Sequence, residues 1–130
     1  MNKKGVALLL ALFTLTFVSM LVVTFIDITT SDLQITANHL ARNKALYIAD
    51  AGIEYVISRL ITSRDPTLNS PTQLPSGSGN SYAVTYDRNS GIINAIGTLS
   101  SGERVILGVK VSVTGSNSPF KVRIINWKEL

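Results

Sequence analysis

The sequence begins with a short basic segment that leads into a long apolar run, and residues 3–26 read KKGVALLLALFTLTFVSMLVVTFI. Residues 6–26 contain neither proline nor glycine, and all their polar side chains are hydroxyls, which can donate to a carbonyl oxygen of the preceding helical turn. These hydroxyl residues are Thr14, Thr16, Ser19 and Thr24. Twenty-one residues at about 1.5 Å each span roughly 30 Å, the thickness of a bilayer's hydrocarbon core. The stretch therefore predicts a transmembrane helix over residues 6–26.

The charges on either side of this helix predict its orientation. Lys3 and Lys4 precede it, whereas Asp27 and Asp32 follow it. Because positively charged flanks stay in the cytoplasm, we expect a single-pass protein of the cytoplasmic membrane, with its N-terminus inside and everything after residue 26 outside. An ordinary cleaved secretory signal fits less well, since the apolar run is too long and no small-x-small motif follows it.

Residues 27–62 continue the predicted helix in amphipathic form. Their larger apolar side chains recur mostly at spacings of three, four and seven, which is the helical period. Alanines fill the gaps and would let another helix approach closely. Arg64-Asp65-Pro66 ends the helix, because the residue before a proline avoids the helical region. The alanines are Ala37, Ala41, Ala45, Ala49 and Ala51, and the larger residues are Ile28, Leu33, Ile35, Leu40, Leu46, Ile53, Val56, Ile57, Leu60 and Ile61.

Residues 63–81 form a predicted linker, rich in proline, serine and glycine and without an acidic cluster that could hold calcium. From residue 82 the apolar period changes to two. Turn residues separate four segments that we predict to be strands, at 82–86, 92–99, 104–114 and 120–127. Gly97 predicts a bulge or a close approach to the helix. Trp127 is expected to pack at the edge of the sheet.

Four antiparallel strands with one apolar face need a cover, and the outer part of the long helix is the candidate. The predicted fold class is therefore α+β, with one long N-terminal helix, transmembrane and then amphipathic, packed on a four-stranded antiparallel sheet. We divide the chain into a leader (1–5), a transmembrane part (6–26), an amphipathic part (27–62), a linker (63–81) and a sheet head (82–130).

Two parts of the sequence are similar to those of a known family. The basic leader, the glycine and the apolar helix resemble the class III signal peptide of type IV pilins and pseudopilins. Residues 45–55, ALYIADAGIEY, resemble the second half of the signature of PilX-type minor pilins. The residues that carry this second match are Ala49, Asp50, Ala51, Gly52 and Glu54. The resemblance covers the chain up to the linker and implies the same plan, a long helix on an antiparallel sheet.

The resemblance also implies a processing step and a set of partners. A prepilin peptidase would cut between Gly5 and Val6, next to the leader charges Lys3 and Lys4, and can methylate the new amine. Glycine suits the junction because it gives a protease close access to the backbone. An assembly platform in the inner membrane would then transfer the helix from membrane lipid to other pilin or pseudopilin subunits. Filament contacts would come from Val6, Leu10, Leu12, Phe13, Phe17 and Leu21.

Leu10 departs from the pattern of the family. Most major pilins have a glutamate at this position, the fifth of the mature chain. Its carboxylate is thought to pair with the N-terminal amine of a neighbouring subunit, since a lone charge in hydrocarbon is costly. PilX-type minor subunits often lack this acid. Leu10 therefore predicts a subunit of the filament tip, or a rare subunit, rather than one of the repeating shaft.

The remaining composition favours a structural or binding protein over an enzyme. The chain of 130 residues has a net charge of +4, but its cations are scattered along the sequence, and no basic stripe with aromatic residues predicts nucleic-acid binding. Without cysteine there is no disulfide and no thiolate metal site. His39 is the single histidine, and no G-x-S-x-G motif accompanies it. We expect no catalytic, cofactor-binding or metal-ligating residue.

Two functions remain open at this point. The first is a minor pilin or pseudopilin of a type IV pilus, a competence apparatus or a type II secretion system. The alternative is a single-pass, membrane-anchored binding module or adhesin that exposes a small β domain outside the cell. The sequence leaves open whether the head binds DNA or a surface ligand.

Overall fold

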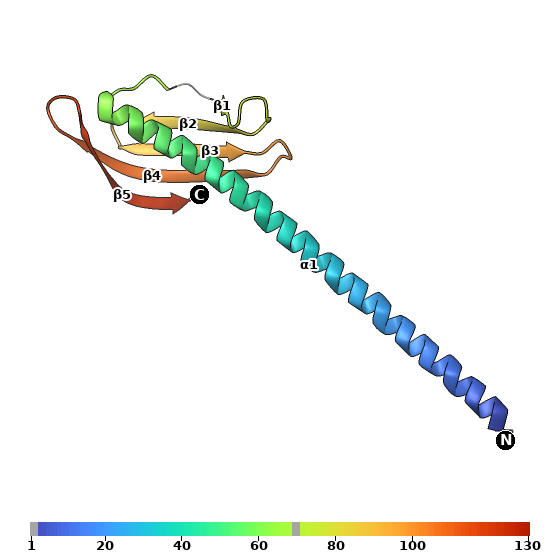
Figure 1. The fold of residues 1–130 in the computed structure, drawn as a ribbon. Coiled ribbons are helices and arrows are strands. Elements are labelled where there is room, and N and C mark those ends of the chain that lie inside the picture. Colours follow the sequence, from blue (N-terminus) through green and yellow to red (C-terminus); the bar gives the residue numbers. More distant parts are fainter. Residues whose placement is uncertain (1–2, 69–70) are drawn as a thin grey trace. The chain divides into compact units, whose positions relative to one another are not determined.

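The computed structural model describes residues 3–68 and 71–130. It begins with one long helix and continues with five strands that form a single antiparallel sheet, ordered as in the chain (Figure 1). This α+β arrangement confirms the predicted fold class. The chain divides into two compact units, Met1–Asn38 and His39–Leu130. The elements are α1 Lys3–Thr62, β1 Thr72–Gln73, β2 Ser81–Asp87, β3 Ile92–Thr98, β4 Arg104–Thr114 and β5 Lys121–Glu129.

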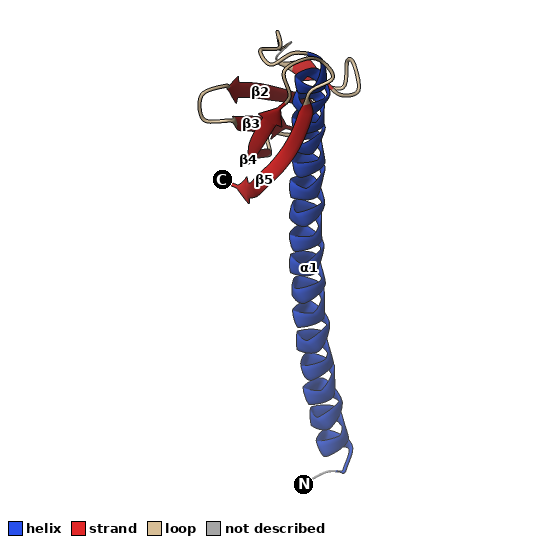
Figure 2. Cartoon of the chain, turned by 90° about the vertical axis from the view of Figure 1, so that its left-hand side faces the viewer, coloured by secondary structure: helices blue, strands red, loops and turns tan. Residues whose placement is uncertain are grey.

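The second unit holds the hydrophobic core, in which the C-terminal part of α1 lies against one face of the sheet (Figure 2). On α1 the buried residues follow the helical period, and along β2, β3 and β4 nearly every second residue is buried. The apolar face of the helix and the apolar face of the sheet therefore pack against each other in one core. Its members are Ala45, Ala49, Gly52, Ile53, Val56 and Leu60 from the helix, and Tyr82, Val84, Ile93, Ala95, Val105, Leu107, Val109 and Val111 from the strands.

The sheet has five strands rather than the predicted four, because the predicted linker contains β1. This short strand pairs with Ser81 and Tyr82 of β2. Just after it, the N–H of Leu74 donates to the carbonyl oxygen of Asn80 at 2.9 Å. The other strands match the predicted segments to within two residues at each end. Residues 69–70 of the linker and residues 1–2 of the leader lie outside the described residues.

Less of the amphipathic helix is buried than the sequence predicts. Burial on α1 begins at Ala45, whereas Ile28, Leu33, Ile35 and Leu40 remain exposed. Ile28, Leu33 and Ile35 belong to the first unit, whereas all the buried residues of α1 belong to the second.

Gly97 of β3 makes the close approach to the helix that the sequence predicted as one of two possibilities. A Cβ at this position would overlap the carbonyl oxygen of Ala45 and lie 2.6 Å from the backbone nitrogen of Ala49. Gly52 is the counterpart on the helix, since its Cβ would lie 2.8 Å from the side chain of Val84. Ala45 and Ala49 therefore serve contact with the chain's own sheet, not the approach of a second helix that we expected of them.

A β-bulge changes the faces of β5 from those that simple alternation predicts. Lys110 pairs with Asn126 and Val111 pairs with Ile124, so Ile125 is the extra residue. Beyond the bulge, Trp127 therefore lies on the same face as Ile124, not on the opposite one. Trp127 is also 43% exposed, so the prediction that it packs at the sheet edge is wrong.

We predict that Gly97→Ala lowers the free energy of unfolding of the head by about 1–3 kcal/mol, because the added methyl group must push the backbone of α1 away. Denaturant titration of the full chain in detergent micelles, with hydrogen exchange at the β3 amides, measures the change. Gly108→Ala is the matched control, since its Cβ would meet only side chains, first the exposed end of Leu130. Equal effects of the two variants would contradict the close approach.

Candidate functional site

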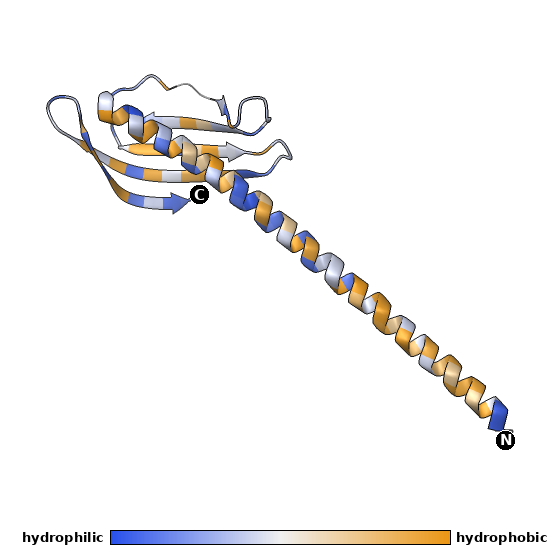
Figure 3. Cartoon of the chain, viewed as in Figure 1, coloured by the Kyte–Doolittle hydropathy of each residue, from blue (hydrophilic) through white to orange (hydrophobic). Residues whose placement is uncertain are grey.

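The first unit presents the predicted membrane segment as a helix that is apolar on all sides. Residues 6–26 are exposed throughout, and α1 contains a stretch long and apolar enough to cross a membrane. In Figure 3 the hydrophobic colour is nearly continuous over this part of α1 and becomes interrupted further along. An all-apolar exposed helix is unfavourable in water and matches a lipid or protein environment.

The hydroxyl side chains of this segment hydrogen-bond within the helix, as predicted. Thr14 and Thr16 donate to the carbonyl oxygens of residues three positions earlier, at 2.9 and 2.8 Å. Ser19 and Thr24 donate to those four positions earlier, at 2.8 and 2.9 Å. In hydrocarbon an unsatisfied polar group is costly, so these bonds make the segment compatible with lipid.

The predicted processing residues lie in the first turn of α1. Lys3 and Lys4 are exposed, and α1 continues through the Gly5–Val6 junction without interruption. A Cβ at Gly5 would meet no atom within 4 Å. The fold of the chain therefore places no steric demand for glycine at position 5, in contrast to Gly97 and Gly52.

The residues predicted for filament packing are all exposed apolar side chains of the first unit. Val6, Leu10, Phe13, Phe17 and Leu21 follow spacings of three and four and so share one face of α1, whereas Leu12 lies off that face. The structure gives them no partner among the described residues outside their own helix turns. Their role in contacts between subunits stays a prediction.

The family-signature residues are divided between the core and the surface. Ala49 and Gly52 are buried against the sheet, Asp50 and Ala51 are half-buried, and Glu54 is exposed. The small members of the signature thus have a packing role inside this chain.

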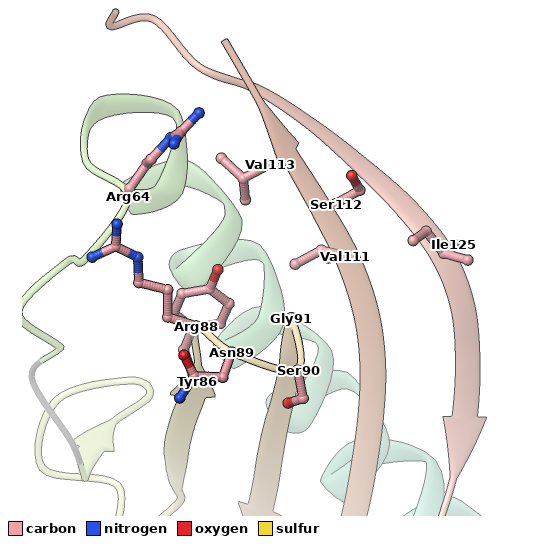
Figure 4. A pocket seen from close by; sticks show the side chains of 10 residues that line it. All are labelled: Arg64, Tyr86, Arg88, Asn89, Ser90, Gly91, Val111, Ser112, Val113 and Ile125. Carbon is pink, nitrogen blue, oxygen red and sulfur yellow. The ribbon is translucent and has the colours of Figure 1, made fainter. Parts of the chain in front are cut away.

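The head has a polar cavity of about 320 Å³ beside the β2–β3 turn (Figure 4). Sequence reasoning missed it, because its residues come from four separate parts of the chain: the segment after α1, the end of β2 with the following turn, the end of β4, and β5. Arg64 is engaged there, since it donates to the carbonyl oxygen of Gly115 and lies over the ring of Phe120. The cavity lining is Arg64, Tyr86, Arg88, Asn89, Ser90, Gly91, Val111, Ser112, Val113 and Ile125.

Two titrating groups at this turn have shifted pKa values. Burial raises the pKa of the Tyr86 hydroxyl, although the charge of Arg88 opposes the shift. The pKa of Asp87 is lowered, mainly because its carboxylate accepts a hydrogen bond from the Ser90 hydroxyl at 2.7 Å, and also one from the N–H of Asn89 at 2.9 Å. Asp87 therefore organises the turn rather than pairing with Arg88.

No group of three His, Asp or Glu side chains that could hold a metal ion occurs within residues 3–68 and 71–130.

One ion pair is found in this part of the chain, between Arg42 of α1 and Glu129 of β5, at 2.6 Å. Both side chains are substantially exposed, so the pair contributes little to stability.

The structure gathers cations that are scattered in the sequence. Along β4 the even-numbered residues face away from α1, and the register with β5 adds residues of that strand to the same face. This outer face carries Arg104, Lys110, Lys121, Arg123 and Lys128, all exposed. The folded head therefore brings together cations that are scattered in the sequence, and the bulge at Ile125 adds Lys128 to this face, which carries no aromatic side chain from β4 or β5.

The chain matches no protein-family model, no curated protein and no solved structure.

We predict that Ser90→Ala raises the pKa of Asp87 toward its ordinary value of 3.8, because the variant removes the main hydrogen bond to the carboxylate. Since the folded pKa is depressed, the turn gains stability from Asp87 above the unfolded pKa and loses it as pH falls through the folded pKa. An NMR titration of the carboxyl carbons measures the pKa of Asp87 in the unmodified protein and in the variant. Ser101→Ala is the matched control, because it removes the corresponding bond to Glu103 and should leave Asp87 unchanged.

Proposed function

We propose that this chain is a minor pilin or pseudopilin, a structural subunit that is stored in the cytoplasmic membrane and then assembled into a type IV pilus or a related filament. In this proposal the N-terminus is cytoplasmic, the sheet head is extracytoplasmic, and a prepilin peptidase removes the leader between Gly5 and Val6. The partners are other pilin or pseudopilin subunits and the inner-membrane assembly platform. The chain has no catalytic role.

One observation supports this proposal above the others. A single helix, Lys3–Thr62, combines a lipid-compatible segment with a segment that packs on a small antiparallel sheet. A simple membrane anchor needs no helical continuity between the span and the domain. A filament subunit does, since its helix must be held by the head at one end and by neighbouring helices at the other.

Gly5 gives a second argument. Glycine loses more conformational freedom than alanine on entering a helix, and nothing in the fold requires a glycine at position 5. Recognition of the bare backbone by a processing enzyme is a reason for the glycine that comes from outside the chain. The adjacent Lys3 and Lys4 hold the junction at the cytoplasmic surface in this scheme.

We predict that the mature protein begins at Val6 and that Gly5→Val abolishes this cleavage, because a branched side chain blocks access to the junction. Mass spectrometry of the N-terminus in cells with a prepilin peptidase reads the result. Ala7→Val places the same side chain two residues further on and should be processed normally. A mature chain that keeps Met1 or Asn2 would favour the alternative, a membrane-anchored binding module or adhesin.

We predict further that the purified mature protein forms no long filaments by itself, because Leu10 provides no acid to neutralise the amine of a neighbouring subunit. Electron microscopy of the protein after detergent removal tests this. Leu10→Glu supplies the acid and should increase lateral association, whereas Leu10→Gln is the uncharged control. Long filaments of the unmodified protein would exclude the tip position.

A further inference from the structure

We propose that β5 is a docking edge for an extended segment of a partner protein, one whose side chains alternate between acidic and apolar residues. The partner segment would extend the sheet as a sixth strand beside Lys121–Glu129. This inference does not rest on the filament role, and it concerns only the second unit.

The first argument is the position of β5. It is the last strand of the sheet and pairs with β4 alone within the described part of the chain, so its outer edge presents backbone N–H and C=O groups without a strand partner. At nine residues it is longer than β2 or β3. An edge of this length can form a full ladder with an added strand.

The second argument is the outer face, which carries charge of one sign. Lys121 and Arg123 pair with Thr114 and Ser112, and Lys128 pairs with Gly108, so the three cations lie on the same side. Strict alternation would put Lys128 on the opposite side, and the bulge at Ile125 prevents this. The single acid of β5, Glu129, pairs with the buried Leu107 and so lies on the other face. An added strand would meet an unopposed basic row.

The third argument is the inner face of β5, which is apolar and uncovered. Ile124 and Trp127 are 46% and 43% exposed, although their cross-strand partners Val111 and Val109 are buried under α1. Val122 continues the row. An added strand would bury these side chains with its own apolar residues, at about 25 cal/mol per Å² removed from water.

Together the three features select an occupant. A membrane surface or a nucleic acid would use the basic face and leave the apolar face and the backbone edge unused. A second copy of β5 would place cations beside cations, which is destabilising. A strand with acids on one side and apolar side chains on the other satisfies both faces and the edge.

The experiment uses the full chain in detergent micelles and a nine-residue peptide of alternating Glu and Val, matched to the length of β5. Trp127 is the only tryptophan, so its fluorescence reports burial at the edge directly. We expect a saturable blue shift with this peptide and none with an alternating Lys and Val peptide. A Glu and Val peptide that is N-methylated at every second residue keeps its charges but loses edge hydrogen bonds. It should bind at least about tenfold more weakly.

Charge reversal supplies the matched variants. Arg123→Glu with Lys128→Glu should abolish the response to the Glu peptide and create one to the Lys peptide, a gain that a misfolded protein would not show. Lys44→Glu with Arg59→Glu changes the net charge equally at exposed positions of α1, and should keep the original preference. Absence of a saturable shift, equal binding of the methylated peptide, or an unaltered preference in the first double variant would each overturn the proposal.

Discussion

The head depends on the close contact between the backbone of β3 at Gly97 and the backbone of α1 at Ala45 and Ala49. At this point no side chain separates helix and sheet. The larger core residues, such as Ile53 and Leu107, then pack on either side at ordinary distances. Small residues on both elements are needed together, because a Cβ on Gly97 or a larger residue at Ala45 would lift the helix from the strands. The lack of a side chain at Gly97 is therefore as important for the packing of helix on sheet as the larger core residues are.

Helix width then determines which part of the sheet is covered. A helix with its side chains is about 10 Å across, whereas neighbouring strands are about 4.8 Å apart. A helix held against β3 covers this strand and its neighbours β2 and β4, where burial alternates regularly. It leaves the apolar side chains of β5 largely uncovered: only Val122 is partly buried there, and the ion pair of α1 with this strand, Arg42–Glu129, is exposed. The exposure of Ile124 and Trp127 follows from a sheet that is wider than its single cover.

The sequence predicted what depends on period and composition. The change from period 3.6 to period two located the helix and four strands, and Gly97 stood out because glycine inside a strand indicates close contact. The missed features depend on long-range pairing. β1 exists because Thr72 meets Tyr82, and the bulge exists because β4 and β5 differ in register at Lys110. Neither has a local signal, apart from the adjacent Ile124 and Ile125, which interrupt the alternation. The cavity beside Tyr86 likewise joins residues of four segments that are distant in the sequence.

The division of α1 bears on the proposed exchange of lipid for protein neighbours. In residues 6–26 the backbone and the hydroxyls are hydrogen-bonded within the helix. A move from bilayer to filament would therefore change only apolar side-chain contacts and would break no hydrogen bond of the segment. In residues 45–60 the contacts are made within the chain and remain the same in either setting. Such a subunit needs no refolding step on assembly, because residues 6–26 and residues 45–60 are stabilised by separate sets of contacts.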